Sequence, residues 1–249
     1  MSHFGEQADN HNSAGTLIPS NRWGADVFID AKLVERNLSD IKSKIAPCKP
    51  RIIGVTKYYG LSSIISGYEA GLRDFGESRA VEAVEKIQAL PEEIHKNSTF
   101  HFIGHLQTNK AEKVVKYFDI IHSVDSLKLA GVISEAACRL NKREKILLQV
   151  NNAGEEQKFG YDADGLIKDF PEILKLSGIE VIGLMNMAPL GASEEVLKKT
   201  FGGLRELRDE LEQRFGVKLP ELSMGMSDDY EVAVKEGATM IRVGRKLFT

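Results

Sequence analysis

Lys57 stands at the end of a segment whose other residues are typical of a buried strand. In RIIGVTKYYG, residues 51–60, Ile52, Ile53 and Val55 are apolar and mostly β-branched, as expected of a strand inside a parallel sheet. A lysine in this place either extends its ammonium group from the rim into solvent or reacts. Burial lowers the pKa of a lysine amine and allows it to form an imine. The candidate partners are a sugar aldehyde, a keto acid and pyridoxal phosphate.

Ser227 and Gly244 stand where two further apolar segments end. Ser227 directly precedes Asp228 and Asp229, which open the next predicted helix, so its hydroxyl and the neighbouring amides could hold a phosphate. Gly244 allows the backbone to approach a ligand closely. Each residue alone also has an ordinary explanation, as a helix N-cap and as a turn. Together, beside Lys57, they favour a phosphorylated ligand.

Arg242 interrupts the apolar run TMIRVG, residues 239–244. A charged residue inside a parallel strand needs a partner. One interpretation pairs Arg242 with a carboxylate such as Glu77 or Asp228. The other places its guanidinium against the pyridine nitrogen of pyridoxal phosphate.

The histidines do not indicate a metal site. His101 and His105 share a strand face, but four residues of strand span about 13 Å, too far for both rings to bind one metal ion. We therefore predict His101, His122 and His95 to be core or network histidines, and no metal. The methionines of GLMNM and SMGM are typical of barrel packing.

The elements that must position these residues alternate without interruption from residue 30. The eight predicted strands cover residues 51–57, 72–77, 99–105, 119–125, 144–151, 179–187, 221–227 and 238–244. One predicted helix separates each strand from the next, which implies a parallel sheet with right-handed crossovers. Eight such units in 249 residues favour a single closed (β/α)₈ TIM barrel over an open sheet. In such a barrel the C-terminal strand ends carry the chemistry.

The two ends of the chain complete the domain prediction. The last strand ends at residue 244 of 249, which leaves no room for an eighth helix. An extra helix at residues 30–46 is expected to fill that place in the outer ring. We predict a flexible tail at residues 1–22 and one barrel domain at residues 23–249.

Composition excludes several classes of partner. The formal net charge is -3 and no block of like charge occurs, so neither nucleic acid nor an anionic membrane is expected as partner. The two cysteines, Cys48 and Cys138, form no paired motif and are expected to be free thiols. No apolar run approaches the roughly 18 residues of a membrane span, and the N-terminus carries no secretory signal. The expected location is cytoplasmic.

Several motifs together resemble one known family. VTK, FGE, HFIGHLQTNK, LLQVNNAGEEQKFG, GLMNMAP and LSMGMSDDYEVAVKEGATMIRVG occur in this order. They are similar to those of the pyridoxal phosphate homeostasis proteins, and the resemblance covers residues 30–248. It implies a single barrel of the alanine racemase N-terminal domain type. It also implies pyridoxal phosphate as cofactor and a role in vitamin B6 homeostasis.

The resemblance assigns roles to individual residues. It places Lys57 on the Schiff-base lysine, Ser227 on the phosphate-binding serine and Arg242 on the arginine that faces the pyridine nitrogen. The predicted cofactor-binding residues are Lys57, Ser78, Met226, Ser227, Arg242, Gly244 and Arg245. Ser78 stands where the family usually has asparagine. Arg245 replaces a small residue or threonine, which leaves a backbone contact to the phosphate but removes a hydroxyl contact.

The expected function is a carrier that holds pyridoxal phosphate as a Schiff base on Lys57 and releases it to apo-enzymes. We expect it to act as a monomer and without catalytic turnover. An arginine stays charged, with a pKa above about 12, and keeps the pyridine nitrogen unprotonated. The ring is then a weak electron sink. The alternatives are a pyridoxal phosphate-dependent amino-acid racemase and a Schiff-base aldolase of phosphorylated sugars.

The racemase alternative requires a second base. Racemases with such an arginine use a lysine and a tyrosine on opposite faces of the cofactor, and the tyrosine comes from an additional domain of a partner subunit. This chain ends at Thr249 and is expected to lack that domain. Tyr58 and Tyr59 flank Lys57, so we do not expect either to reach the opposite face.

Overall fold

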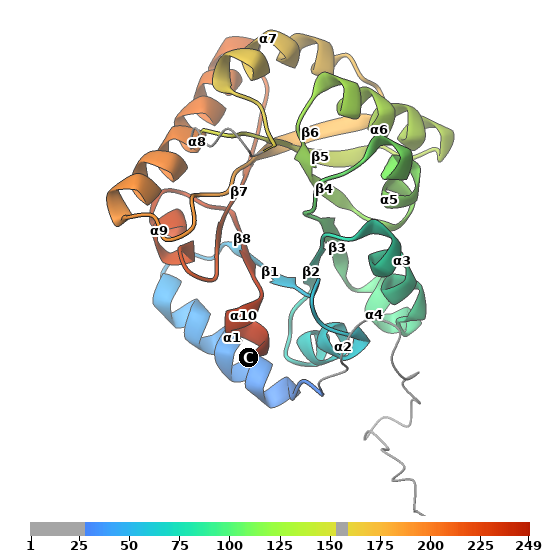
Figure 1. The fold of residues 1–249 in the computed structure, drawn as a ribbon, viewed down its shortest axis with the longest axis vertical. Coiled ribbons are helices and arrows are strands. Elements are labelled where there is room, and N and C mark those ends of the chain that lie inside the picture. Colours follow the sequence, from blue (N-terminus) through green and yellow to red (C-terminus); the bar gives the residue numbers. More distant parts are fainter. Residues whose placement is uncertain (1–27, 153–158) are drawn as a thin grey trace, which may run out of the picture.

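The computed structural model describes residues 28–152 and 159–249, so the predicted tail at residues 1–22 lies outside the described part of the chain. In the described residues, eight parallel strands close into a barrel in the order β1 to β8. Figure 1 looks down this barrel and shows the helices as an outer ring around the strands. The predicted closed (β/α)₈ fold is confirmed.

The elements have the following bounds. The strands are β1 Arg51–Val55, β2 Asp74–Glu77, β3 Thr99–Phe102, β4 Ile120–Val124, β5 Glu144–Gln149, β6 Ile179–Met185, β7 Glu221–Met226 and β8 Met240–Val243. The helices are α1 Ala31–Ile45, α2 Leu61–Glu69, α3 Ala80–Ala89, α4 Glu92–Lys96, η1 Thr108–Lys110, α5 Ala111–Tyr117, α6 Leu127–Arg139, α7 Ala163–Leu174, α8 Glu194–Phe215, α9 Tyr230–Lys235 and α10 Arg245–Phe248. Most strands end slightly earlier than predicted, because the polar residues at their C-terminal ends belong to loops.

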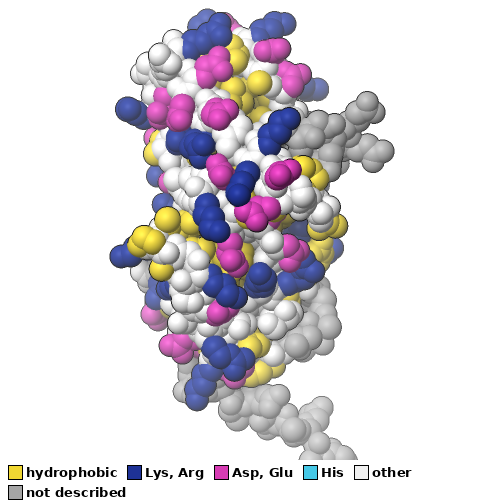
Figure 2. All heavy atoms as spheres, turned by 90° about the vertical axis from the view of Figure 1, so that its left-hand side faces the viewer, with side chains coloured by type: hydrophobic (Ala, Val, Ile, Leu, Met, Phe, Trp, Pro, Cys, Tyr) yellow, Lys and Arg dark blue, Asp and Glu magenta, His cyan; other side chains and the backbone are white. Residues whose placement is uncertain are grey.

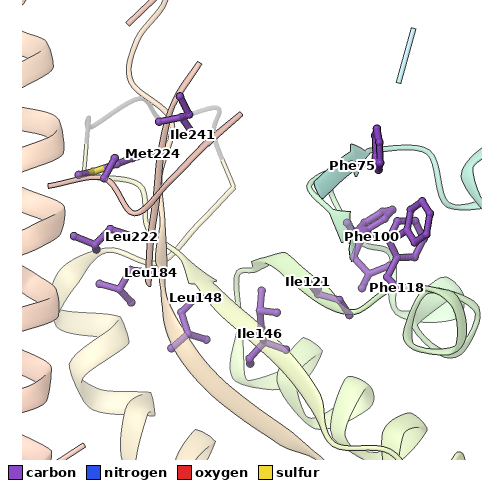
Figure 3. Packing of buried hydrophobic residues seen from close by; sticks show 14 of the residues in the cluster. Phe75, Phe100, Phe118, Ile121, Ile146, Leu148, Leu184, Leu222, Met224 and Ile241 are labelled. Carbon is purple, nitrogen blue, oxygen red and sulfur yellow. The ribbon is translucent and has the colours of Figure 1, made fainter. Parts of the chain in front are cut away.

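Apolar residues pack on both sides of the strands. The outer side faces the helices, and Figure 3 shows Phe75, Phe100 and Phe118 gathered in this layer. A second, smaller cluster consists of Ile53, Ile120, Leu147, Ile182, Met185 and Met240. Several buried side chains on the strands are polar, among them His101 and Arg242. These polar groups are part of the site described below.

The region after β8 differs from the prediction. A one-turn helix, α10, follows β8, so the expectation that no helix could follow is wrong. The amides of Leu247 and Phe248 both donate to the carbonyl of Gly244, which closes the turn. The extra N-terminal helix packs beside it: the side chain of Asn37 in α1 donates to the carbonyl of Leu247 at 3.1 Å. As Figure 1 shows, α1 and α10 together occupy the eighth place of the outer ring.

The surface agrees with the balanced composition. Figure 2 shows basic and acidic side chains interspersed on the face where α8 and α9 lie. Within residues 28–152 and 159–249, no helix is long and apolar enough to cross a membrane. In the same described residues, no three histidine, cysteine or acidic side chains are grouped as metal ligands would be. Cys48 and Cys138 are free thiols, as predicted, and both are exposed.

Candidate functional site

Lys57 lies two residues beyond the end of β1, at the C-terminal mouth of the barrel. Its side chain is half-buried, and its Nζ atom is 5.0 Å from the centre of the Tyr58 ring. Tyr58 itself is exposed. Tyr59 packs instead against Phe248, with ring centres 5.2 Å apart. The amine therefore lies at the rim, between buried backbone and an exposed aromatic ring.

A buried ion pair holds the backbone that carries Lys57. Nζ of Lys86, from α3, lies 2.8 Å from Oε1 of Glu77, and both side chains are almost completely buried. Lys86 also donates to the carbonyl of Thr56 at 3.0 Å, and the Thr56 hydroxyl donates to Glu77 at 2.8 Å. Breaking a buried pair leaves an uncompensated charge and costs about 3–5 kcal/mol. The cluster therefore fixes Thr56, the residue before Lys57.

The loop after β7 is shaped by Gly225 and Asp229. Gly225 has a φ of 88°, and a Cβ atom there would lie 2.6 Å from Cβ of Ala233, so only glycine fits. The carboxylate of Asp229 accepts the amide hydrogen of Met226. Burial raises the pKa of Asp229, and this hydrogen bond opposes the rise. Ser227 is enclosed by this turn and is buried.

The loop after β8 approaches β1 and the β7 loop. A Cβ atom on Gly244 would lie 3.2 Å from the carbonyl oxygen of Val55. Arg245 forms a 2.6 Å ion pair with Asp228, and both side chains are largely exposed. The Arg245 cation thus bridges the loops after β7 and β8, while Gly244 keeps the space beside β1 free of a side chain.

Arg242 is buried in the barrel between β7 and β1. Its Nη1 atom donates to the Ser223 hydroxyl at 2.7 Å, and its Nη2 atom donates to the carbonyl of Asn186 at 2.8 Å. Burial lowers the pKa of Arg242 to about 10, an effect that the nearby Asp229 carboxylate opposes.

Of the two interpretations of Arg242, the ion pair with Glu77 or Asp228 is wrong. Glu77 pairs with Lys86 and Asp228 with Arg245. The reason is geometric. Glu77 lies at the end of β2 beside α3, and Asp228 lies in an exposed loop, whereas the Arg242 guanidinium is directed to Ser223 and Asn186.

The histidines form a network, as predicted for two of them. His101 and His122 are completely buried, and their rings are joined by a 2.9 Å hydrogen bond between Nδ1 of His101 and Nε2 of His122. His95 does not belong to the core. It is exposed, and its ring stacks on Phe100. The prediction of a core position for His95 is therefore wrong, because the residue lies among polar residues on the short surface helix α4.

Ser78 follows β2 at the same end of the barrel and is half-buried. Its carbonyl oxygen would lie 2.2 Å from a Cβ atom on Gly104, so the loops after β2 and β3 are in close contact. A cavity of about 380 Å³ opens beside Ser78 and is also lined by Phe102 and Gln107.

Three adjacent strands bring the main candidates together. In the sheet, Arg242 is opposite Ile53 of β1 on one side and Met226 of β7 on the other. Lys57, Ser227 and Gly244 follow the ends of these three strands. The mouth therefore combines a primary amine, a hydroxyl, loop amides and a buried guanidinium. This set of groups suits a phosphorylated carbonyl compound with an acceptor nitrogen.

Comparisons with known proteins identify the family. The family model of the alanine racemase N-terminal domain matches residues 29–249. A protein of Synechocystis named "Pyridoxal phosphate homeostasis protein" is 44% identical over 202 residues, which cover 81% of this chain and 92% of that protein. This chain belongs to the pyridoxal phosphate homeostasis protein family.

Solved structures agree with this membership. PipY of Synechococcus elongatus PCC7942, a structure with pyridoxal phosphate bound, is 38% identical and has a TM-score of 0.79, with 87% of this chain and 100% of PipY covered. An alanine racemase of Clostridium difficile is 19% identical, with a TM-score of 0.73 over 88% of this chain and 57% of that chain. At that identity the second likeness shows the shared barrel fold only.

The sequence did not reveal every residue around the site of this family member. Lys86, Ser223 and Asp229 hold the predicted residues in place but were not assigned to the site. Lys86 occupies one position of an amphipathic helix, where lysine is ordinarily exposed. Of these three, Ser223 carried a signal in the sequence: it is a polar residue within the apolar run of β7, four residues before Ser227.

Proposed function

We propose that this chain holds pyridoxal phosphate as a Schiff base on Lys57 and supplies the cofactor to apo-enzymes without catalytic turnover. We propose further that it acts as a monomer in the cytoplasm. The observation that carries the proposal is the buried Arg242 guanidinium between the strands that lead to Lys57 and Ser227. Membership of a family named for this cofactor and the pyridoxal phosphate bound to PipY support it.

The chemical groups at the mouth of the barrel are suited to binding the different parts of pyridoxal phosphate. The Ser227 hydroxyl and the amides after Met226 and Gly244 would hold the phosphate. Gly244 suits this role because any side chain there would meet the Val55 carbonyl. Arg245 contributes its backbone, since its guanidinium is paired with Asp228. Ser78, which follows the strand next to β1, would line the edge of the site.

The amine of Lys57 would provide the covalent link. Pyridoxal phosphate would supply an aldehyde, which the Lys57 amine would hold as an imine with loss of one water molecule, so no oxidant or reductant would be needed. The half-buried position of Lys57 keeps the amine accessible to cofactor from solution. It also suits reversible release.

Arg242 favours carriage over racemisation. Although burial lowers its pKa to about 10, the guanidinium remains charged at neutral pH. It can only donate hydrogen bonds, so it would hold the pyridine nitrogen as an unprotonated acceptor. Carbanion formation beside such a ring is poorly assisted. Tyr59, one of the two tyrosines considered as a second base, packs on Phe248.

Visible spectroscopy tests the proposal. We expect the purified protein, incubated with pyridoxal phosphate, to be yellow, to lose this colour with borohydride, and to carry the reduced cofactor on Lys57 in peptide mass spectrometry. Lys57→Ala should abolish the colour, and the exposed Lys128→Ala should not. A colourless wild-type protein would refute the carrier and favour the aldolase. Deuterium uptake at the α-carbon of single-enantiomer amino acids in heavy water would instead favour the racemase.

A further inference from the structure

A chain of buried polar groups crosses the barrel beneath the proposed cofactor site. Nε2 of His101 lies 2.9 Å from Oδ1 of Asp74, the first residue of β2. Nδ1 of His101 lies 2.9 Å from Nε2 of His122, whose Nδ1 lies 2.9 Å from the Ser223 hydroxyl. That hydroxyl accepts from Arg242 at 2.7 Å. The chain thus joins strands β2, β3, β4, β7 and β8.

The two ends of this chain fix the direction of its hydrogen bonds. Arg242 can only donate, and an ionised Asp74 can only accept. His101 must therefore donate from Nε2 to Asp74. If both rings are neutral, Nδ1 of His101 accepts from Nε2–H of His122. Nδ1 of His122 then accepts from the Ser223 hydroxyl, whose oxygen accepts from Arg242.

The surroundings of His122 agree with neutral rings. The ring is completely buried, and burial, together with the neighbouring His101 and Arg242, lowers the pKa of His122 well below its usual value. A positive charge on either ring would be buried in the same core as the positive charge of Arg242 and would be repelled by it. The only arrangement that pairs every ring nitrogen without such a charge is the one directed from Arg242 to Asp74.

We propose that Asp74, His101, His122 and Ser223 are positioning residues for Arg242. Asp74 sets the tautomer of His101, which in turn sets that of His122. Because the Ser223 hydroxyl hydrogen is donated to His122, the Ser223 oxygen accepts from the guanidinium. With the Asn186 carbonyl as second acceptor, the guanidinium plane has a single orientation. The inference rests on the proposed function in one respect, that Arg242 faces the ring nitrogen of pyridoxal phosphate.

The far end of the chain is separated from the cofactor site. Asp74 lies at the N-terminal end of β2, the end of the barrel opposite Lys57, and lines a cavity of about 500 Å³ there together with Arg51. Nε of Arg51 is 3.7 Å from the Asp74 carboxylate. The hydrogen bonds through His101, His122 and Ser223 link Asp74 to Arg242, so we expect a change at Asp74 to reach Arg242 through these side chains.

Nitrogen NMR of the protein without added cofactor tests the direction of the chain. With ¹⁵N-labelled histidine at neutral pH, we expect His101 and His122 to be neutral and protonated at Nε2. A ring protonated at Nδ1, or a cationic ring, would overturn the proposal. Asp74→Asn should allow the amide to reverse and populate the Nδ1–H tautomer of His101. Glu180→Gln, an exposed carboxylate at the same end of the barrel, should leave both tautomers unchanged.

Ser223→Ala tests the effect on Arg242. Loss of a hydrogen bond to a charged group should weaken pyridoxal phosphate binding about tenfold and shift the visible maximum of the bound cofactor. Ser134→Ala removes a buried hydroxyl that accepts a hydrogen bond from the Gly178 amide, and should change neither. An unchanged spectrum and affinity in a folded Ser223→Ala protein would overturn the proposal. If the wild-type protein binds no pyridoxal phosphate, the proposed function fails, whereas the tautomers remain measurable.

Discussion

The position of Lys57 depends on charged residues behind it. Lys86 and Glu77 are both buried and both bond to Thr56. Which cation pairs with which carboxylate could not be predicted from residue types, because it depends on how β2 and α3 lie in the closed barrel. One interpretation of the sequence therefore paired Glu77 with Arg242, whereas in the structure Glu77 pairs with Lys86.

Lys86→Met should destabilise the protein strongly. The substitution keeps the length of the side chain but leaves the Glu77 carboxylate buried without its cation, which costs about 3–5 kcal/mol. Urea denaturation measures the loss. Because Thr56 also loses a partner, we expect weaker pyridoxal phosphate binding by the folded fraction.

An exposed pair provides the matched control. Lys44→Met removes a 2.8 Å ion pair with Asp40 on the surface of α1, where solvent screens the charges. Its urea midpoint should stay close to that of the wild type. Equal midpoints for Lys86→Met and Lys44→Met would show that the buried pair does not support the fold.

Glu144 should make stability depend on pH. Burial raises its pKa to about 7, although Lys142 opposes the rise. The folded state therefore binds a proton that the unfolded state has released above its ordinary pKa of 4.5. Glu144 contributes fully to the free energy of unfolding below pH 4.5. This contribution is lost as the pH rises from 4.5 to about 7, and the change amounts to roughly 3 kcal/mol.

Glu144→Gln should remove this dependence. The thermal midpoint of the variant should exceed that of the wild type at pH 8, and the two should converge near pH 4. Glu180→Gln, exposed on the neighbouring strand, provides the comparison. A constant difference between Glu144→Gln and wild type across this pH range would contradict the assignment.

Among the secondary-structure elements, the long periodic ones were predictable and the single turns were not. The apolar spacing of α1, with Val34, Leu38, Ile41 and Ile45 buried, is a local property of the sequence. The order of strands then follows from strict alternation. By contrast, α4, η1 and α10 are each too short for a periodic pattern. Their formation depends on contacts with the rest of the barrel.

Gly225→Ala should disturb the turn that leads from β7 to Ser227. The methyl group would meet Ala233 at 2.6 Å, at a φ of 88° that non-glycine residues adopt at a cost of about 1–3 kcal/mol. We expect lower stability and weaker binding of pyridoxal phosphate, measured by urea denaturation and by titration.

Gly131→Ala is the control for this substitution. Gly131 lies within α6, and a Cβ atom there would have no neighbour within 4 Å. Alanine at such a position should stabilise the helix by about 0.5–1 kcal/mol. If Gly225→Ala is tolerated as well as Gly131→Ala, the turn is not strained and its glycine is not required.

In the molecule as a whole, β1 and β8 close the barrel next to the proposed site. Phe248 of α10 lies behind this junction: its ring packs on Tyr59 at 5.2 Å, and it is almost completely buried. The sequence predicted that α1 would cover this region but not that α10 would share it. The two helices meet through Asn37 and Leu247.

Phe248→Ala should affect both stability and cofactor binding. Removal of a buried phenylalanine costs about 3–5 kcal/mol, and Tyr59 loses its packing partner two residues from Lys57. Phe170→Ala, in the contact of α7 with Phe215, should cost a similar amount of stability. Calorimetry and pyridoxal phosphate titration should therefore show similar destabilisation, with reduced affinity only for Phe248→Ala.

The closed order of the strands also bears on how the protein would precipitate. Each of the eight strands pairs with two neighbours, so the native barrel offers no free sheet edge on which another chain could add a strand. Opening between β1 and β8 would create two such edges at once. If heat-induced aggregation begins with opening at this junction, a cross-link between α1 and α10 should delay turbidity.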